Sequence, residues 1–188
     1  MAIERPPEGR MPGIRPRQTL GRRLDVTARA AFPFACTVLL MLFSMAPFGF
    51  ASQAMLLPAL TLPSVFFWSL FRPAAMPPPA VFVIGLLLDL LGYLPVGSGV
   101  LTLLLLHGFT VRWRRTLARQ GFAVVWMSFA ALAAGAATLL WALASLLTFR
   151  LLPPAPAVFL LVLTVAVYPA IAILFTLAHR SVADPERA

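Results

Sequence analysis

Long apolar runs follow one another along most of this chain, with short polar segments between them. At a helical rise of about 1.5 Å per residue, crossing the hydrocarbon core of a bilayer takes about 20 apolar residues. The pattern predicts six membrane-crossing helices, at about 31–48, 54–71, 77–91, 100–110, 122–149 and 158–178. Pro58 and Pro63 should kink or split the second of these helices. The chain is therefore expected to be an all-α helical bundle in a membrane.

Composition favours a membrane protein over a soluble domain. Hydrophobic residues make up 61% of the chain and charged residues only 11%, and the net charge is +9. All the basic residues are arginines, and they stand at the ends of apolar runs rather than on one folded surface. We interpret them as topology signals and contacts with anionic lipid, and we expect no nucleic-acid partner.

Polar segments divide the chain into a tail at 1–30, a membrane domain at 31–180 and a short tail at 181–188. The first tail is polar and rich in proline, so we expect it to be disordered at first and helical only near the membrane. Six spans place both termini on one side. With the tails, Arg72 and the 112–119 segment in the cytoplasm, only Arg150 lies outside. The positive-inside rule thus predicts a bacterial inner-membrane protein with cytoplasmic termini.

The beginning of the chain allows one other interpretation. Arg22 and Arg23 precede an apolar run, and the residues at 49–51 could mimic the small-residue cleavage site of a twin-arginine export signal. The basic region is long for such a signal, and several further spans follow. We therefore treat the first run as a retained span.

One acidic residue interrupts the apolar run GLLLDLLGYLPVG at 85–97. This residue, Asp89, is the only acidic residue between Asp25 and Asp184. On a helix, Gly85 and Gly92 fall on the same stripe as Asp89, and small residues allow a neighbouring helix to approach closely. A charge left in hydrocarbon would cost roughly 2.5–3.5 kcal/mol or more. The stripe therefore predicts an inward face that another helix shields.

Two roles are open to Asp89. It could be a packing or assembly contact near the outer end of its helix, or a proton or substrate site. A proton relay needs a second titratable group at similar depth. His107 is expected nearer the cytoplasmic side, as a satisfied interface histidine. We favour the packing contact, for which the candidate hydrogen-bond partners are Tyr93, Ser98 and Thr102.

The sequence contains no arrangement typical of catalysis. It lacks a plausible Ser-His-Asp or Cys-His set, paired carboxylates and a glycine-rich phosphate loop. The single cysteine, Cys36, excludes an intramolecular disulfide and a cysteine-based metal site. We therefore expect no catalytic, cofactor-binding or metal-binding residue.

Small residues and tryptophans give two further predictions. Ala131 and Gly135 are four residues apart, a spacing that permits close helix contact. We favour packing inside this bundle over contact with a span of another protein. Trp68, Trp113 and Trp126 are expected at the level of the lipid headgroups.

Three motifs taken in order resemble the rod shape-determining protein MreD family. They are FFWSLFRP at 66–73, GLLLDLLGYLPVG at 85–97 and RWRR at 112–115. The family pattern has W-x-x-x-R-P at the end of the second span, then G-L-x-x-D followed by P-x-G. The match is carried by Trp68, Arg72, Pro73, Gly85, Asp89, Pro95 and Gly97. We take Trp68, Arg72, Gly85, Asp89, Gly92, Pro95 and Gly97 as the candidate packing and assembly positions.

This resemblance implies a non-catalytic subunit of the bacterial cell-elongation machinery, which supports rod shape and lateral peptidoglycan synthesis. Such a subunit binds MreC and organises a RodA-type glycosyltransferase and a class B penicillin-binding transpeptidase. Either anionic lipid, which we favour, or cytoskeletal MreB would face the cytoplasmic arginines, Arg112, Arg114, Arg115 and Arg119.

The fold of this family is similar to the substrate-binding subunits of energy-coupling-factor transporters. That likeness supplies the alternative function, a substrate-binding membrane subunit of a small-molecule transporter. The alternative predicts a polar cavity that opens outward and is lined by Asp89, Tyr93, Ser98, Thr102 and Tyr168.

Overall fold

The computed structural model of the chain describes residues 20–46 and 53–183, with side chains for 31–46 and 55–177. The described residues form six α-helices and one 3-10 turn, and they contain no strand. In chain order the elements are α1 (Leu20–Ser44), α2 (Gln53–Phe71), η1 (Pro73–Ala75), α3 (Pro78–Leu91), α4 (Ser98–Leu117), α5 (Phe122–Leu147) and α6 (Ala155–Ala183). The predicted all-α fold is confirmed.

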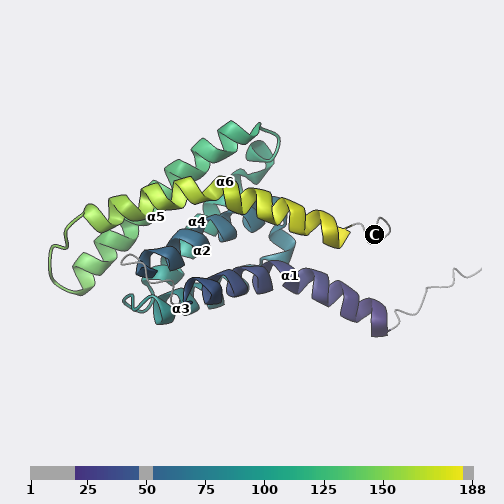
Figure 1. The fold of residues 1–188 in the computed structure, drawn as a ribbon, viewed down its shortest axis with the longest axis horizontal. Helices are drawn as coiled ribbons and strands as arrows, with labels where there is room; N and C mark the ends of the chain where they lie inside the picture. Colours follow the sequence, from purple (N-terminus) through teal and green to yellow (C-terminus); the bar gives the residue numbers. More distant parts are fainter. Residues whose placement is uncertain (1–19, 47–52, 184–188) are drawn as a thin grey trace, which may run out of the picture.

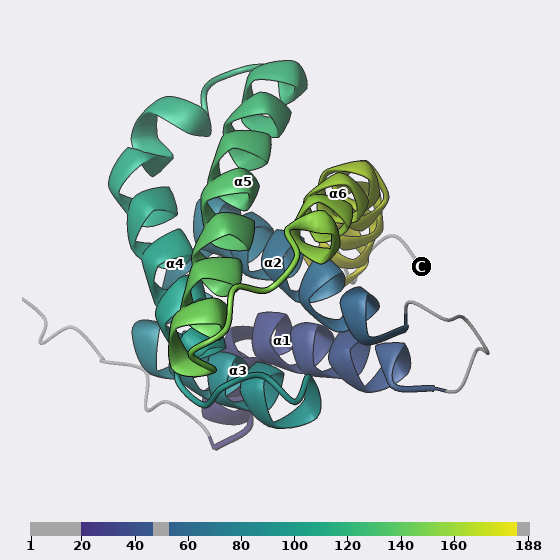
Figure 2. The same ribbon diagram turned by 90° about the vertical axis from the view of Figure 1, so that its left-hand side faces the viewer.

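Helix α2 lies at the centre of the bundle, where it contacts all five other α-helices (Figure 2). Every residue from Thr61 to Leu70 is buried. A helix that is apolar on all sides can be covered by neighbouring helices or by lipid, and in α2 neighbouring helices cover this segment.

The two prolines inside α2 do not divide it. The helix continues through Pro58 and Pro63 from Gln53 to Phe71, so the alternative of a split span is wrong. The hydroxyls of Thr61 and Ser64 donate to carbonyls one turn earlier, at 2.7 and 2.6 Å. These bonds satisfy the two buried hydroxyls within their own helix.

The elements define two ends of the bundle. The described termini, at the start of α1 and the end of α6, lie toward one end of the long axis, which we call the terminal end (Figure 1). The α3–α4 turn and the α5–α6 loop lie toward the opposite end, which we call the far end (Figure 1). Helix α4 begins at the far end, so its C-terminus and the α4–α5 turn lie toward the terminal end.

Two helices are long and apolar enough to cross a bilayer. They are α5, with a mean hydropathy of 1.9, and α6 over Ala155–Leu177, with 2.7. Only 22% and 33% of their most apolar windows are buried, whereas the core helix of a soluble protein is mostly buried. Length, composition and this exposed apolar surface suggest a membrane protein. The remaining apolar helices are shorter, at Ala31–Ser44, Met55–Phe71 and Pro78–Leu91.

The helices differ from the predicted spans mainly at their polar ends. Helix α1 already begins at Leu20, α4 continues through the RWRR segment to Leu117, and α6 begins at Ala155. An apolar pattern marks where lipid contact would end, but hydrogen bonding can extend a helix beyond that point. The predictions for 1–19, 47–52 and 184–188 lie outside the described residues.

The small residues of α5 do not all pack inside the bundle. Ala133 and Ala137 are buried, but Ala131 and Gly135 are exposed. A Cβ added at Gly135 would meet no atom within 4 Å. The prediction that Ala131 and Gly135 form a contact inside the bundle is therefore wrong, because α5 turns its other small face toward the core.

Candidate functional site at the far end of the bundle

Asp89 caps the helix that follows its own. Its side chain, 2% exposed, extends from the end of α3 to the first turn of α4. The N–H of Gly97 donates to Oδ2 at 2.7 Å, and the N–H of Gly99 donates to Oδ1 at 2.6 Å. The N–H of Val100 lies 3.4 Å from Oδ2. Because the N-cap residue of α4, Gly97, has no side chain, Asp89 provides the capping oxygen, and its negative charge suits the positive end of the helix dipole.

The first turn of α4 has a partner for every amide. A helix leaves its first four N–H groups without partners inside the helix. Asp89 accepts those of Gly97, Gly99 and Val100, and the N–H of Ser98 donates to the carbonyl of Pro95 at 3.0 Å. An unpaired amide in hydrocarbon costs several kcal/mol. The tight turn expected at Pro95 and Gly97 therefore works together with the carboxylate to begin α4.

Two glycines allow α3 and α4 to approach this closely. A Cβ at Gly85 would lie 2.6 Å from the Cα of Val100, and a Cβ at Gly99 would lie 2.5 Å from Oδ1 of Asp89. The first contact is with backbone, which cannot rotate away. The second would displace the capping oxygen. Both positions therefore need a residue without a side chain.

Of the predicted partners of Asp89, only Ser98 lies beside it. The Oγ atom of Ser98 is 3.3 Å from Oδ1 but 2.7 Å from the carbonyl of Pro95, which is the better acceptor for its single proton. The hydroxyl of Thr102 donates to the Ser98 carbonyl at 2.7 Å, and Tyr93 is 95% exposed. Reasoning from side chains missed the backbone amides. The glycine at the N-cap position was the signal, because such a helix start needs an acceptor from elsewhere.

Two aromatic residues at the far end adopt the left-handed backbone conformation. Tyr93 follows α3 and Phe149 follows α5, each with φ of 52°, and they are 95% and 92% exposed. The next residues, Leu94 and Arg150, donate to carbonyls five residues earlier at 3.1 and 3.2 Å, as in a Schellman motif. A residue other than glycine at this position costs roughly 1–2 kcal/mol. Two exposed rings held at that cost indicate a contact surface.

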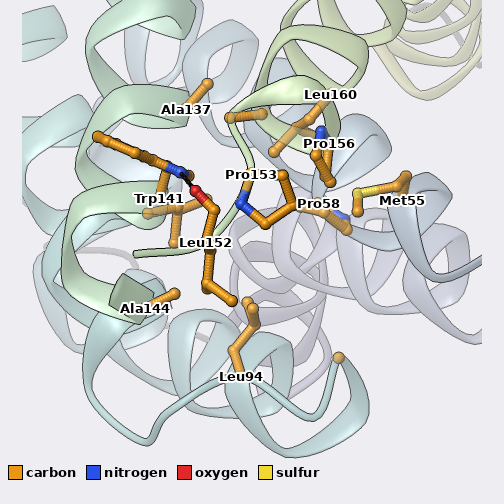
Figure 3. A pocket seen from close by; sticks show the side chains of 13 residues that line it. Met55, Pro58, Leu94, Ala137, Trp141, Ala144, Leu152, Pro153, Pro156 and Leu160 are labelled. Carbon is orange, nitrogen blue, oxygen red and sulfur yellow. Dashed lines mark hydrogen bonds between the residues drawn. The ribbon is translucent and has the colours of Figure 1, made fainter. Parts of the chain in front are cut away.

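An apolar groove opens beside these two turns (Figure 3). It has a free volume of about 300 Å³ and is lined by α2, the turn after α3, the second half of α5, the α5–α6 loop and the start of α6. Trp141 Nε1 donates to the carbonyl of Leu152 at 3.0 Å, which ties the loop to α5 along one wall (Figure 3). We call it the far-end groove. Its lining includes Met55, Pro58, Gly92, Leu94, Ala144, Pro156 and Leu160. None of its lining residues is titratable.

The residues expected to line a polar outward cavity do not line this groove. Tyr168 is buried at 1% exposure, and its ring stacks on Phe129 with centroids 4.5 Å apart. The others belong to the α3–α4 contact or to the surface, namely Asp89, Tyr93, Ser98 and Thr102. Their positions follow from helix packing, which the sequence pattern does not specify.

Trp68 is fully buried, so the prediction that it anchors the chain at the headgroups is wrong. Its ring lies 6.1 Å from that of Phe32 in α1 and 4.8 Å from that of Phe175 in α6, measured between centroids. Trp68 belongs to the central helix, and neighbours on both sides separate it from lipid. Trp113, by contrast, is 63% exposed, as expected for an interface residue.

Polar contacts also join α2 and α4 toward the terminal end. The hydroxyl of Ser69 lies 2.8 Å from Nδ1 of His107, and both residues are buried. The prediction of an interface histidine is confirmed. Arg114 Nε donates to the carbonyl of Leu70 at 3.0 Å. Asp89 and His107 thus belong to different helix contacts. Arg72 is half-buried, whereas the other arginines of this end, Arg112, Arg114, Arg115 and Arg119, are exposed.

Comparison with protein-family models, with curated proteins and with solved structures finds no match to this chain. Among the described residues, no three His, Cys, Asp or Glu side chains gather in a way that could hold a metal ion. The far end combines a carboxylate occupied by backbone amides, two exposed aromatic rings and an open apolar groove. This arrangement is suited to binding an apolar partner.

Proposed function

We propose that this chain is a six-span bacterial inner-membrane protein that serves as a non-catalytic subunit of the cell-elongation machinery. The proposal starts from the resemblance of its motifs to the MreD family. In it, the chain binds the membrane span and juxtamembrane part of MreC. It thereby organises a RodA-type glycosyltransferase and a class B penicillin-binding transpeptidase for lateral peptidoglycan synthesis and rod shape.

Arginine positions support an orientation with the terminal end in the cytoplasm. Arg72 follows α2, and the arginines of 112–119 stand in the last turns of α4 and just after it, whereas Arg150 alone stands in the α5–α6 loop at the far end. Positive charge is retained on the cytoplasmic side of bacterial membranes. The far-end groove therefore opens toward the outer face, where the juxtamembrane part of MreC would emerge from the bilayer.

The observation that carries the proposal is the far-end groove beside an occupied carboxylate. The groove is open and apolar, and the exposed residues Tyr93 and Phe149 belong to two of the segments that line it, although neither ring lines the groove itself. Aromatic residues around an apolar pocket are typical anchors of protein interfaces. Asp89 accepts the amides of α4 and so supplies no acid, base or ion ligand to the groove. A surface of this kind supports assembly better than chemistry.

A pair of matched variants tests the groove. Ala144 lines it, whereas Ala142 lies two residues away on the exposed face of α5. Ala144→Phe should fill the groove and lower the recovery of MreC with a tagged chain purified from membranes. Ala142→Phe, the same change outside the groove, should leave recovery unchanged. Equal recovery of MreC with both variants would show that the groove does not bind MreC.

The same purification separates the transporter alternative. A substrate-binding subunit should bring down a pair of ATPases with their coupling subunit instead of MreC and the wall synthases. The alternative also requires hydrogen-bonding groups around an outward cavity, and the far-end groove is lined by apolar residues. We therefore favour the assembly subunit, and recovery of an ATPase pair would contradict it.

A further inference from the structure

A second groove follows the seam between α4 and α5. Two hollows of about 300 and 270 Å³ share Phe109, Ala131 and Leu132 in their walls, so they join into one groove. It extends along α4 from Thr102 to Leu117. The space beside its α5 wall is unoccupied, because Ala131 is exposed and a Cβ at Gly135 would meet nothing within 4 Å.

Arginines stand where this groove reaches the terminal end. Phe109, Arg112, Trp113 and Thr116 are spaced as i, i+3, i+4 and i+7, so they share one face of α4. Phe109 and Trp113 line the groove, which places Arg112 on the same face. Arg119 lies in the turn that joins α4 to α5 and closes the seam. Both arginines are exposed.

These arginines have no acidic counterpart in the described side chains. Asp89 is the only acidic residue between 31 and 177, and it caps α4 at the opposite end of that helix. The tail at 1–30 has seven arginines against three acidic residues, and the tail at 181–188 has one arginine and two acidic residues. Within the described side chains, Arg112 and Arg119 are thus exposed cations with no acidic neighbour.

We propose that the α4–α5 groove binds one anionic phospholipid of the cytoplasmic leaflet. An acyl chain lies against Ala131 and Gly135, and the phosphate contacts Arg112 and Arg119. Guanidinium groups bind phosphate with paired hydrogen bonds, and Trp113 stands at the depth where the headgroup begins. An apolar helix from a partner would cover the groove but would leave both arginines without a counter-charge. The inference rests on the membrane placement proposed above and is independent of MreC.

Native mass spectrometry of the full chain in mild detergent tests this site. The probe is an equimolar mixture of phosphatidylglycerol and phosphatidylcholine with identical acyl chains. The wild-type chain should retain one phosphatidylglycerol in preference to phosphatidylcholine. Arg112→Gln with Arg119→Gln should lower that preference roughly tenfold, since each arginine near a charged headgroup contributes to binding. Arg150→Gln, which removes one charge at the far end, should not change it.

A second variant tests the groove itself. Gly135→Leu places a side chain in open space, so the thermal stability should stay the same or rise. It should nevertheless reduce retention of both lipids. Equal retention of the two headgroups by the wild type would overturn the proposal, as would retention that neither variant changes. Cross-linking of Ala131→Cys to a helix of another protein in membranes would also overturn it. If the wild-type chain retains phosphatidylglycerol but does not recover MreC, the result contradicts the proposed function and not the lipid site.

Discussion

The α3–α4 corner around Asp89 and the far-end groove share the segment 92–94 but are built in opposite ways. The corner is closed and polar, its amides are paired, and a Cβ fits at neither Gly85 nor Gly99. The groove is open and apolar, and Ala144 faces free volume. Substitutions in the corner should therefore change stability first, and substitutions in the groove should change binding first.

The largest effect is expected for Asp89→Leu. It leaves the amides of Gly97, Gly99 and Val100 without an acceptor, at about 3 kcal/mol or more in the free energy of unfolding. Asp89→Asn keeps one acceptor oxygen and should cost about 1–2 kcal/mol. Thermal unfolding of the purified chain in detergent measures both. Equal stability of wild type and Asp89→Leu would show that the cap does not support the fold.

Glycine substitutions should rank next. Gly85→Ala and Gly99→Ala should each lower stability by about 1–3 kcal/mol, because their new methyl groups overlap backbone or the capping oxygen. Gly108→Ala is the matched control within α4, since a Cβ there meets nothing within 4 Å. It should be neutral or stabilising by up to about 1 kcal/mol. The same unfolding measurement applies, and a destabilised Gly108→Ala would break the comparison.

Tyr93→Gly should separate stability from binding in a single residue. Glycine removes the left-handed strain and should raise stability by about 0.5–1 kcal/mol after its greater freedom in the unfolded chain is counted. Removing the ring should lower MreC recovery. Tyr93→Ala removes the ring but keeps the strained backbone, so it should lower recovery without the gain in stability. Wild-type recovery with both variants would exclude Tyr93 from the interface.

The most local effect is expected for Trp141→Phe. It deletes the donor to the half-buried carbonyl of Leu152 and should cost about 1 kcal/mol, while loosening the α5–α6 loop. Trp126→Phe deletes a similar bond, to the carbonyl of Val165 at 3.1 Å, at an exposed position, and should cost less. Amide exchange across 150–157 should increase only in Trp141→Phe. Faster exchange there in both variants would contradict a local role for Trp141.

Apolar periodicity and proline placement predicted most of the helices. The predicted ends of α2, α3 and α5 agree closely with the structure, because Pro73, Gly92 and Gly121 mark where those helices end or begin. The starts of α1 and α6 and the end of α4 were missed. At these places the helix continues into polar or proline-containing sequence, and hydrogen bonding rather than apolar pattern sets the boundary.

The candidate site was only partly accessible from the sequence. The stripe of Gly85 and Asp89 predicted a close helix contact, and the structure has one there. The partners of Asp89 are backbone amides whose positions depend on the turn geometry, so residue types could not reveal them. Trp68 was misplaced because a tryptophan near the end of an apolar run looks the same in a central and in a peripheral helix. The far-end groove joins residues from three helices and two connections, and no local pattern indicates it.

The most direct test of the account is the amount of MreC recovered per folded chain, compared between Asp89→Asn and Ala144→Phe. We expect Asp89→Asn to lower the unfolding temperature but to keep recovery per folded chain near the wild-type value. Ala144→Phe should keep the unfolding temperature near the wild-type value but lower the recovery per folded chain. Loss of recovery or of rod shape in Asp89→Asn, with an unchanged unfolding temperature, would contradict the structural role of Asp89 and point to a titrating one.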